Sequence, residues 1–340
     1  MSTQQPSPEQ IMRVGMGFEA SKTLLSAVEL GVFTELAKEP ADAAGLRDRL
    51  GLHPRAARDF LDALVATGFL RRVDGVYHNT AETDTYLDRN KPTYLEMGTL
   101  LDMANSRLYG IWGSLTEALR AGTAQDESKS TDLETYDALY SDPVRLKQFL
   151  ASMTGVSSAA NRWIARRFPW KHHTRIADMG TAQGDLAVQV LRENPHMRGV
   201  GFDLPPAAPV FEEYVRDHGL EGRLGFVGGD FFADDYPEAD VLTFGHILHN
   251  WDLERKKILL RKAWEALPEG GAVVVYDSLI DDDRSRNASA LLMSLTMLLV
   301  TDGGFGYTAA ECRGWMAEVG FSRTWTEYVD GSDGVVVGIR

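Results

Sequence analysis

The sequence predicts an α/β protein in three segments: a helical winged domain over residues 1–100, a helical connector over residues 101–150, and a doubly wound sheet over residues 151–340. Two observations carry this prediction. Within residues 174–280, short apolar runs end in acidic residues, as the strands of a buried parallel sheet often do. Residues 24–79 instead show helical segments followed by a hairpin pattern.

The first 100 residues carry the helical patterns and the hairpin. Residues 24–37 have apolar side chains at helical spacing, AGLRDRLGL predicts a short helix, and a longer helix begins with Pro54, which suits a first helical turn. RRVDGVYHN predicts a hairpin with Asp74 and Gly75 at its turn. Helices followed by a hairpin in this order predict a winged helix-turn-helix domain.

Such a domain raises DNA binding by a regulator as a rival function. The chain has 35 basic and 49 acidic residues, a formal net charge of −14. The expected recognition helix sets Arg55 and Arg58 against Asp59 and Asp62. Attraction to phosphate supplies most non-specific affinity for DNA, so this charge balance argues against a nucleic-acid partner.

Composition agrees with a cytoplasmic enzyme. Apolar residues make up 44% of the chain and charged residues 25%, as in ordinary globular proteins. Cys312 is the single cysteine, which excludes an internal disulfide. No apolar run approaches the roughly 18 residues that span a bilayer. The polar opening MSTQQPSPEQ predicts a disordered lead rather than a signal peptide, so we expect no membrane partner.

Three carboxylates are expected to meet at one edge of the sheet. Asp178, Asp203 and Asp230 follow successive apolar runs, and the carboxyl ends of parallel strands share an edge. Asp203 follows the second run, 25 residues after Asp178, where a carboxylate accepts hydrogen bonds from a ribose diol. The predicted ligand therefore carries an adenosine.

A glycine-rich turn narrows the ligand class. Gly180, Ala182 and Gly184 give G-x-A-x-G before a helix over residues 185–193. The fingerprint G-x-G-x-x-G and the phosphate loop ending in Gly-Lys-Ser/Thr are both absent, so neither pyrophosphate nor triphosphate has an obvious cradle. Taken alone, the turn fits a plain strand-to-helix connection equally well. The turn becomes strong evidence for a nucleoside-cofactor site only together with Asp203, Asp230 and the motif that follows.

Five segments resemble, in order and spacing, the S-adenosylmethionine-dependent O-methyltransferases of the plant caffeate and bacterial natural-product (acetylserotonin-type) class: ADMGTAQG, GFDLPPAAP, GGDFF, GHILHNWDLERKKILLRKAWEALPEGG and VVVYDSLI. The resemblance spans nearly the whole chain. It implies a class I methyltransferase with a Rossmann-like sheet, S-adenosylmethionine as cofactor and S-adenosylhomocysteine as product. It also implies a winged domain that serves dimerisation, and hence a homodimer of secondary metabolism.

The resemblance assigns the cofactor-binding residues. The glycine turn would border the methionine half of the cofactor, Asp203 with Leu204 the ribose, and Asp230 with Phe231 the adenine. The implied set is Asp178, Gly180, Ala182, Gly184, Asp203, Leu204, Asp230, Phe231, Gly245 and His246.

ILHNWD, residues 247–252, carries the catalytic prediction. His249 matches the family's general base, and histidine changes protonation readily near neutral pH. A phenol has a pKa of about 10 and imidazole about 6.5, so complete proton transfer beforehand would cost roughly 5 kcal/mol. We therefore expect deprotonation to accompany methyl transfer. Asp277 matches a family glutamate that pairs with this histidine and would fix its tautomer.

Aromatic and methionine side chains predict a planar acceptor. Tyr136 and Tyr140 belong to an aromatic-rich connector, and methionines adapt to flat rings. The resemblance and the spacing give a candidate substrate set of Tyr109, Trp112, Phe149, Met153, Met293 and Met297. A core or dimer-interface role is an equally good interpretation of each. The expected reaction is methyl transfer to a hydroxyl of a small aromatic molecule, and transfer to carbon or nitrogen stays open.

The chain departs from the family pattern at three places. Asn250 replaces an aspartate, Gly306 stands near the position of a further glutamate, and His246 precedes the base by three residues. His246 could line the cofactor pocket, accept a proton or fill space, and we favour space-filling. His246, His249 and Asp277 could form a two-His-one-carboxylate metal site, but no H-E-x-x-H or cysteine ligand accompanies them, so we expect no metal.

Overall fold

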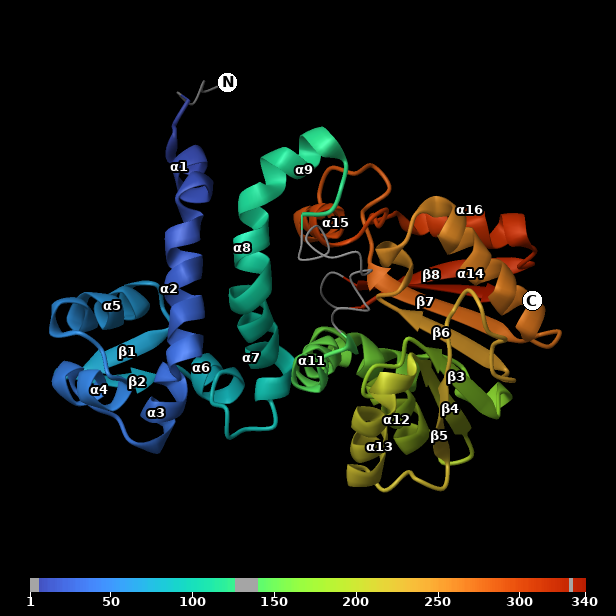
Figure 1. The fold of residues 1–340 in the computed structure, drawn as a ribbon, viewed down its shortest axis with the longest axis horizontal. Helices are drawn as coiled ribbons and strands as arrows, with labels where there is room; N and C mark the ends of the chain where they lie inside the picture. Colours follow the sequence, from blue (N-terminus) through green and yellow to red (C-terminus); the bar gives the residue numbers. More distant parts are fainter. Residues whose placement is uncertain (1–5, 126–139, 330–332) are drawn as a thin grey trace, which may run out of the picture. The chain divides into compact units, whose positions relative to one another are not determined.

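The computed structural model describes residues 6–125, 140–329 and 333–340, apart from the side chains of residues 95 and 96. The chain forms two compact units, residues 1–110 and 111–340, called here the N-terminal and C-terminal units (Figure 1). In the described part of the chain, no helix is long and apolar enough to cross a membrane.

The N-terminal unit contains short helices and one hairpin. Its elements are α1 (Glu9–Gly15), α2 (Gly17–Leu30), α3 (Val32–Lys38), α4 (Ala43–Leu50), α5 (Pro54–Ala66), β1 (Leu70–Val73), β2 (Val76–Asn79), α6 (Ala81–Tyr86) and α7 (Tyr94–Met103); the short α8 (Tyr109–Ile111) crosses the boundary between the units. The predicted hairpin is confirmed, since Asp74 and Gly75 both have the positive φ that its two-residue turn requires. The helical pattern over residues 24–37 is divided in two by Gly31, which has φ +73°.

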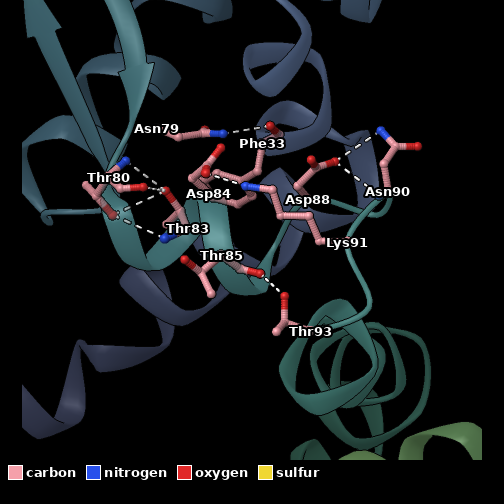
Figure 2. A network of polar contacts seen from close by, with 10 residues as sticks. All are labelled: Phe33, Asn79, Thr80, Thr83, Asp84, Thr85, Asp88, Asn90, Lys91 and Thr93. Carbon is pink, nitrogen blue, oxygen red and sulfur yellow. Dashed lines mark hydrogen bonds and ion pairs between the residues drawn. The ribbon is translucent and has the colours of Figure 1, made fainter.

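Polar contacts tie the end of the hairpin to α3 and α6 (Figure 2). The amide of Asn79 donates to the carbonyl of Phe33 over 2.8 Å, and both groups are buried. Thr80 and Thr83 form a capping box that starts α6. Figure 2 also shows the contacts farther along the chain, Asp84 with Lys91, Thr85 with Thr93 and Asp88 with Asn90.

The C-terminal unit is a seven-stranded sheet between two layers of helices (Figure 1). Its elements are α9 (Leu115–Ala121), α11 (Pro143–Arg167), β3 (Arg175–Met179), α12 (Asp185–Glu193), β4 (Arg198–Asp203), α13 (Ala208–Asp217), β5 (Leu224–Gly228), β6 (Val241–Gly245), α14 (Leu253–Ala266), β7 (Ala272–Ser278), α15 (Ala288–Val300), α16 (Ala309–Val319), β8 (Arg323–Tyr328) and β9 (Asp333–Ile339). Apolar side chains of α11, α12 and α13 fill one face of the sheet, and those of α14 and α16 fill the other.

The strand order is β5-β4-β3-β6-β7-β9-β8, in which β3 to β7 are parallel and β9 runs antiparallel to β7 and β8. The order reverses between β3 and β6, and ligands of doubly wound sheets bind at such a switch point. The doubly wound prediction is confirmed, and α12 lies where a helix is predicted. The C-terminal hairpin of β8 and β9 was not predicted. α11 runs across the predicted boundary near residue 150.

Candidate active site

The glycine turn that follows β3 has left-handed backbone at every second residue. Gly180, Ala182 and Gly184 have φ +74°, +50° and +91°. A Cβ on Gly180 would lie 2.3 Å from the side chain of Ile247, and one on Gly184 would lie 2.6 Å from the ring of Phe211. The turn therefore needs glycine at both ends, because the backbone passes directly against its neighbours.

Asp203 is the carboxylate that the turn holds. Its Oδ2 accepts the backbone N–H of Ala182 over 3.0 Å, and its Oδ1 accepts the N–H of Leu204 over 2.8 Å and the hydroxyl of Tyr140 over 3.0 Å. Burial raises the pKa of Asp203, and these donors oppose that rise. A carboxylate offers about four acceptor positions, so Asp203 has capacity for a further hydroxyl donor.

Asp178 and Asp230 have other roles in this geometry. Both oxygens of Asp178 accept hydroxyls, from Thr243 over 2.7 Å and Thr181 over 2.9 Å, and burial raises its pKa to about 6. Asp178 therefore links Thr181 of the glycine turn to Thr243 of β6. Asp230 is exposed and accepts the N–H groups of Phe232 and Ala233, which places it in a turn of its own.

Phe231, the residue after Asp230, packs its ring against the end of the sheet. Phe231 lies 5.9 Å from Phe202 between ring centroids, in a stacked arrangement. Gly245, at the end of β6, leaves room for the ring of Tyr276, since a Cβ there would lie 2.0 Å from that ring. The ring of Phe231 thus packs on the buried ring of Phe202, and a Cβ on Gly180 would lie 3.2 Å from the Phe231 ring, so this ring borders the glycine turn.

His249 and Asp277 form a buried pair. His249 lies in the short turn Leu248–Asn250 after β6, and Asp277 lies near the end of the neighbouring strand β7. Nδ1 of His249 is 2.5 Å from Oδ1 of Asp277. Burial alone would raise the pKa of Asp277, but His249 and His246 outweigh it and hold the pKa well below its usual range. An ionised Asp277 keeps the hydrogen on Nδ1, which makes Nε2 the nitrogen that accepts a proton.

Three further groups surround Asp277. The N–H of Ser278 donates to Oδ1 over 2.9 Å, and the hydroxyl of Tyr307 donates to Oδ2 over 3.0 Å. Nδ1 of His246 is 3.5 Å from Oδ1. Sequence reasoning missed Tyr307, although it directly follows Gly306, because a tyrosine before a helix start is typical of ordinary core packing.

His246 lies between two carboxylates. Its Nε2 is 3.8 Å from Oδ2 of Asp333, which begins β9. Burial alone would lower the pKa of His246, but Asp277 and Asp333 outweigh it and raise the pKa. His246 has φ +52°, and the amide of Asn250 donates to its carbonyl over 3.0 Å. The aspartate of the family pattern has no such donor when ionised, so Asn250 stabilises this unusual turn.

The candidate substrate residues fall into two units. Phe149 of α11 packs in one cluster with Tyr140 and with Ala182 of the glycine turn. In α15, Met297 is buried and Met293 is half-buried, while Met153 on α11 and Trp112 are also half-buried. The hydroxyl of Tyr109 donates to the carbonyl of Phe18 inside the N-terminal unit. Tyr136 lies outside the described residues.

The spacing of His249 and Asp277 is that of a hydrogen bond. Ligand atoms of His246, His249 and Asp277 all lie within 4.8 Å of one another. Zinc ligands bind at about 2.0–2.2 Å, so two of them on a tetrahedron lie about 3.3 Å apart. The 2.5 Å between Nδ1 of His249 and Oδ1 of Asp277 is shorter than this, so an ion would have to separate the pair. That no metal takes part stays a prediction.

Comparisons with known proteins agree across the chain. Residues 112–322 match the model of an O-methyltransferase domain, and residues 12–89 match that of an O-methyltransferase dimerisation domain. The chain is 42% identical to the tetracenomycin polyketide synthesis 8-O-methyl transferase TcmO of Streptomyces glaucescens, over 97% of this chain and 96% of that protein. It is 36% identical to the N,N-dimethyltransferase OxyT of Streptomyces rimosus, over the same shares.

A solved structure supports the same conclusion. Human N-acetylserotonin methyltransferase in complex with SAM superposes with a TM-score of 0.90 at 25% identity, over 100% of this chain and 99% of that one. The resemblance noted in the sequence is thereby confirmed. The chain belongs to the S-adenosylmethionine-dependent O-methyltransferase family, and it is a methyltransferase with the family's dimerisation domain in its N-terminal part.

Proposed function

We propose that this enzyme transfers a methyl group to a phenolic hydroxyl of a small, polyketide-like aromatic molecule, with His249 as general base. The pairing of His249 with Asp277 carries the proposal, because it leaves Nε2 as the proton acceptor and places a carboxylate behind Nδ1. The identity of 42% with a polyketide 8-O-methyl transferase supports the acceptor class.

The cofactor site fits an adenosine-bearing molecule on structural grounds. Asp203 retains an acceptor position at the switch point of the sheet, and the left-handed turn at residues 180–184 brings backbone to its side. We assign ribose binding to Asp203, adenine contact to Phe231, and contact with the methionine half to the glycine turn. When bound, S-adenosylmethionine supplies a sulfonium methyl group that is already electrophilic.

The chain's own residues handle the acceptor's proton. Nε2 of His249 takes the proton of the hydroxyl as the oxygen becomes nucleophilic, and Asp277 stabilises the imidazolium that results. Holding the acceptor in line, rather than activating it with a metal, supplies the remaining rate. We assign acceptor positioning to Phe149, Met153, Met293 and Met297.

Dimerisation and location complete the proposal. The dimerisation domain supports a homodimer formed through the N-terminal unit. The composition supports a cytoplasmic enzyme, and the acidic net charge of −14 supports the absence of a nucleic-acid partner.

The test is an acceptor panel with labelled cofactor. We expect methylation of phenolic polyketide-like compounds, with the label on oxygen by mass spectrometry. His249→Ala should lower kcat by about 10²- to 10⁴-fold while the affinity for S-adenosylhomocysteine stays unchanged. His172→Ala, which alters an exposed histidine, is the control.

Three outcomes would change the conclusion. Label on an amine would favour N-methylation, which the 36% identity to an N,N-dimethyltransferase makes the second candidate. Label on carbon would show C-methylation. A wild-type rate in His249→Ala would show that positioning alone drives catalysis here.

A further inference from the structure

The two oxygens of Asp277 have different partners. Oδ1 faces Nδ1 of His249 and accepts the N–H of Ser278, whereas Oδ2 accepts the hydroxyl of Tyr307 over 3.0 Å. Asp277 is 1% exposed. A buried carboxylate oxygen that loses its donor pays a desolvation penalty, so the contact with Tyr307 matters for how the carboxylate is held.

Tyr307 is itself fixed on several sides. It is 1% exposed, and its ring lies 5.3 Å from that of Trp315 between centroids. Its carbonyl accepts the N–H of Ile280, just beyond β7, over 2.9 Å. The next residue, Thr308, starts α16 with a capping box. The hydroxyl therefore reaches Oδ2 from a side chain whose ring and backbone are both held.

Position 306 contributes no charge to the pair. A Cβ on Gly306 would lie 3.0 Å from Cβ of Ser294 and 3.2 Å from Cδ1 of Ile280, and the N–H of Gly306 donates to the hydroxyl of Ser294 over 2.9 Å. A longer side chain at 306 would force these neighbours to shift. The partner that this segment offers the catalytic pair is therefore the neutral donor of Tyr307 rather than a second carboxylate.

We infer that Tyr307 is a positioning residue: its hydroxyl holds Oδ2 of Asp277 so that Oδ1 stays directed at Nδ1 of His249. The inference rests on the proposed role of His249 as base. Burial and the charge of Asp277 raise the pKa of Tyr307 well above its usual range, so the phenol remains a donor throughout the working pH range.

The test removes the hydroxyl and keeps the ring. Tyr307→Phe should lower kcat about 10- to 100-fold, the rate equivalent of a hydrogen bond to a charged group. The KM of the acceptor and the Kd of S-adenosylhomocysteine should change by less than about twofold. The low-field proton NMR signal of the His249 Nδ1–H, assigned by its loss in His249→Asn, should move or broaden in Tyr307→Phe.

A matched control deletes a similar hydroxyl elsewhere. Tyr77 is 2% exposed and donates to Oδ1 of Asp62 over 2.6 Å in the N-terminal unit. Tyr77→Phe should leave kcat and the low-field signal unchanged. A double-mutant cycle adds a second check, because Tyr307→Phe should cost little further activity once Asp277→Asn has removed the carboxylate.

The outcomes separate this inference from the proposed function. A wild-type kcat and an unmoved low-field signal in Tyr307→Phe would overturn the inference, and so would equal losses in kcat and cofactor affinity. A wild-type rate in His249→Ala would contradict the proposed role of His249 as base. The low-field signal of Tyr307→Phe, compared with that of wild type, would still test whether Tyr307 positions Asp277. If Tyr307→Phe does not fold, wild-type protein labelled with 3-fluorotyrosine, whose phenol is a stronger donor, should show a shifted signal, and no shift overturns the inference.

Discussion

Asp277 is a buried carboxylate surrounded by donors and by potential cations. His249, His246, Tyr307 and the N–H of Ser278 all face it. An isolated buried carboxylate would be strongly destabilising, and only close partners offset the loss of water. His249 and His246 outweigh burial and hold the pKa of Asp277 well below its usual range. The residue that we propose orients the base His249 therefore depends on its neighbours to remain charged.

His246 predicts a pH dependence of stability. Its pKa is raised above the usual value of about 6.5, so its contribution is complete below that pH and is lost as pH rises through the folded-state pKa. The difference in free energy of unfolding between wild type and His246→Asn should therefore be largest below about pH 6.5 and shrink as the pH rises above that value. Asparagine suits the left-handed backbone at this position. His172→Asn, at an exposed site, is the control. A difference that does not vary with pH would contradict the prediction.

The proposed role of Asp203 predicts how much cofactor affinity is lost when its charge is removed. Asp203→Asn keeps the shape of the side chain but removes the charge that we propose accepts the ribose hydroxyls. We expect the binding of S-adenosylhomocysteine to weaken by about 1.5–3 kcal/mol in calorimetry. Asp230→Asn should cost less, because Asp230 is exposed and already accepts two backbone N–H groups. Unchanged affinity in a folded Asp203→Asn variant would remove Asp203 from the cofactor site.

Some site residues can be predicted from the sequence and others cannot. Asp203, His249 and Asp277 end strand-like runs, so topology alone brings them to one edge. Tyr307 and Asp333 reach the site only through the packing of segments far along the chain, and no local pattern marks them. Their roles follow from tertiary contacts, which single-sequence patterns do not encode.

Among the elements, the loop after α15 packs against the turn Leu248–Asn250, which carries His249. A Cβ on Gly304 would lie 2.6 Å from the carbonyl oxygen of His249 and 2.4 Å from Oγ1 of Thr301. The buried amine of Lys256 donates to the carbonyls of Trp251 and Phe305, over 2.6 and 3.1 Å, and burial lowers its pKa to about 7. Lys256 thus joins the residue after the turn Leu248–Asn250 to the loop that contains Gly304.

Gly304→Ala tests this support. The added methyl has no space, so we expect a loss of about 1–3 kcal/mol in the free energy of unfolding and a lower kcat as His249 is displaced. The matched control is Gly314→Ala in α16, where a Cβ would meet nothing within 4 Å. That variant should be neutral or stabilised by up to about 1 kcal/mol, because alanine favours helix. Equal stability and activity in the two variants would contradict the packing role.

Element prediction succeeded where local signals were strong. Pro54 at the start of α5 and the Asp74–Gly75 turn are such signals. β9 was missed because a buried apolar run does not reveal its direction, and this strand runs antiparallel to β7. Its reversal brings Asp333 opposite Ser278, and so beside His246.

At the scale of the whole molecule, the distribution of charge bears on whether the winged domain could bind DNA. Asp62 of α5 pairs with Arg58 and with Arg72 of the hairpin, so acidic groups neutralise basic ones on the elements that would face DNA. Hydrogen bonding to Tyr77 and Arg72 holds the pKa of Asp62 below its usual value. The rejection of DNA binding stays a prediction, which these pairs support.

The apolar residues near the start of the chain predict a dimer interface. Ile11 and Val14 of α1 are 75% and 72% exposed, and Phe18 of α2 is 53% exposed. Exposed apolar side chains gathered on neighbouring helices are typical of surfaces that a partner covers, and a second copy fits the match of residues 12–89 to a dimerisation domain. Burying one such side chain contributes about 1.5–3 kcal/mol.

Introducing charge into α1 should therefore dissociate the dimer. We expect light scattering to give a dimer for wild type and a monomer for the double variant Ile11→Glu, Val14→Glu, because two carboxylates per copy would have to be buried. Leu119→Glu is the control, since Leu119 of α9 is 61% exposed and belongs to the C-terminal unit. That variant should remain a dimer. A monomeric wild type, or a double variant that stays dimeric at micromolar concentration, would place the association elsewhere on the chain or exclude it.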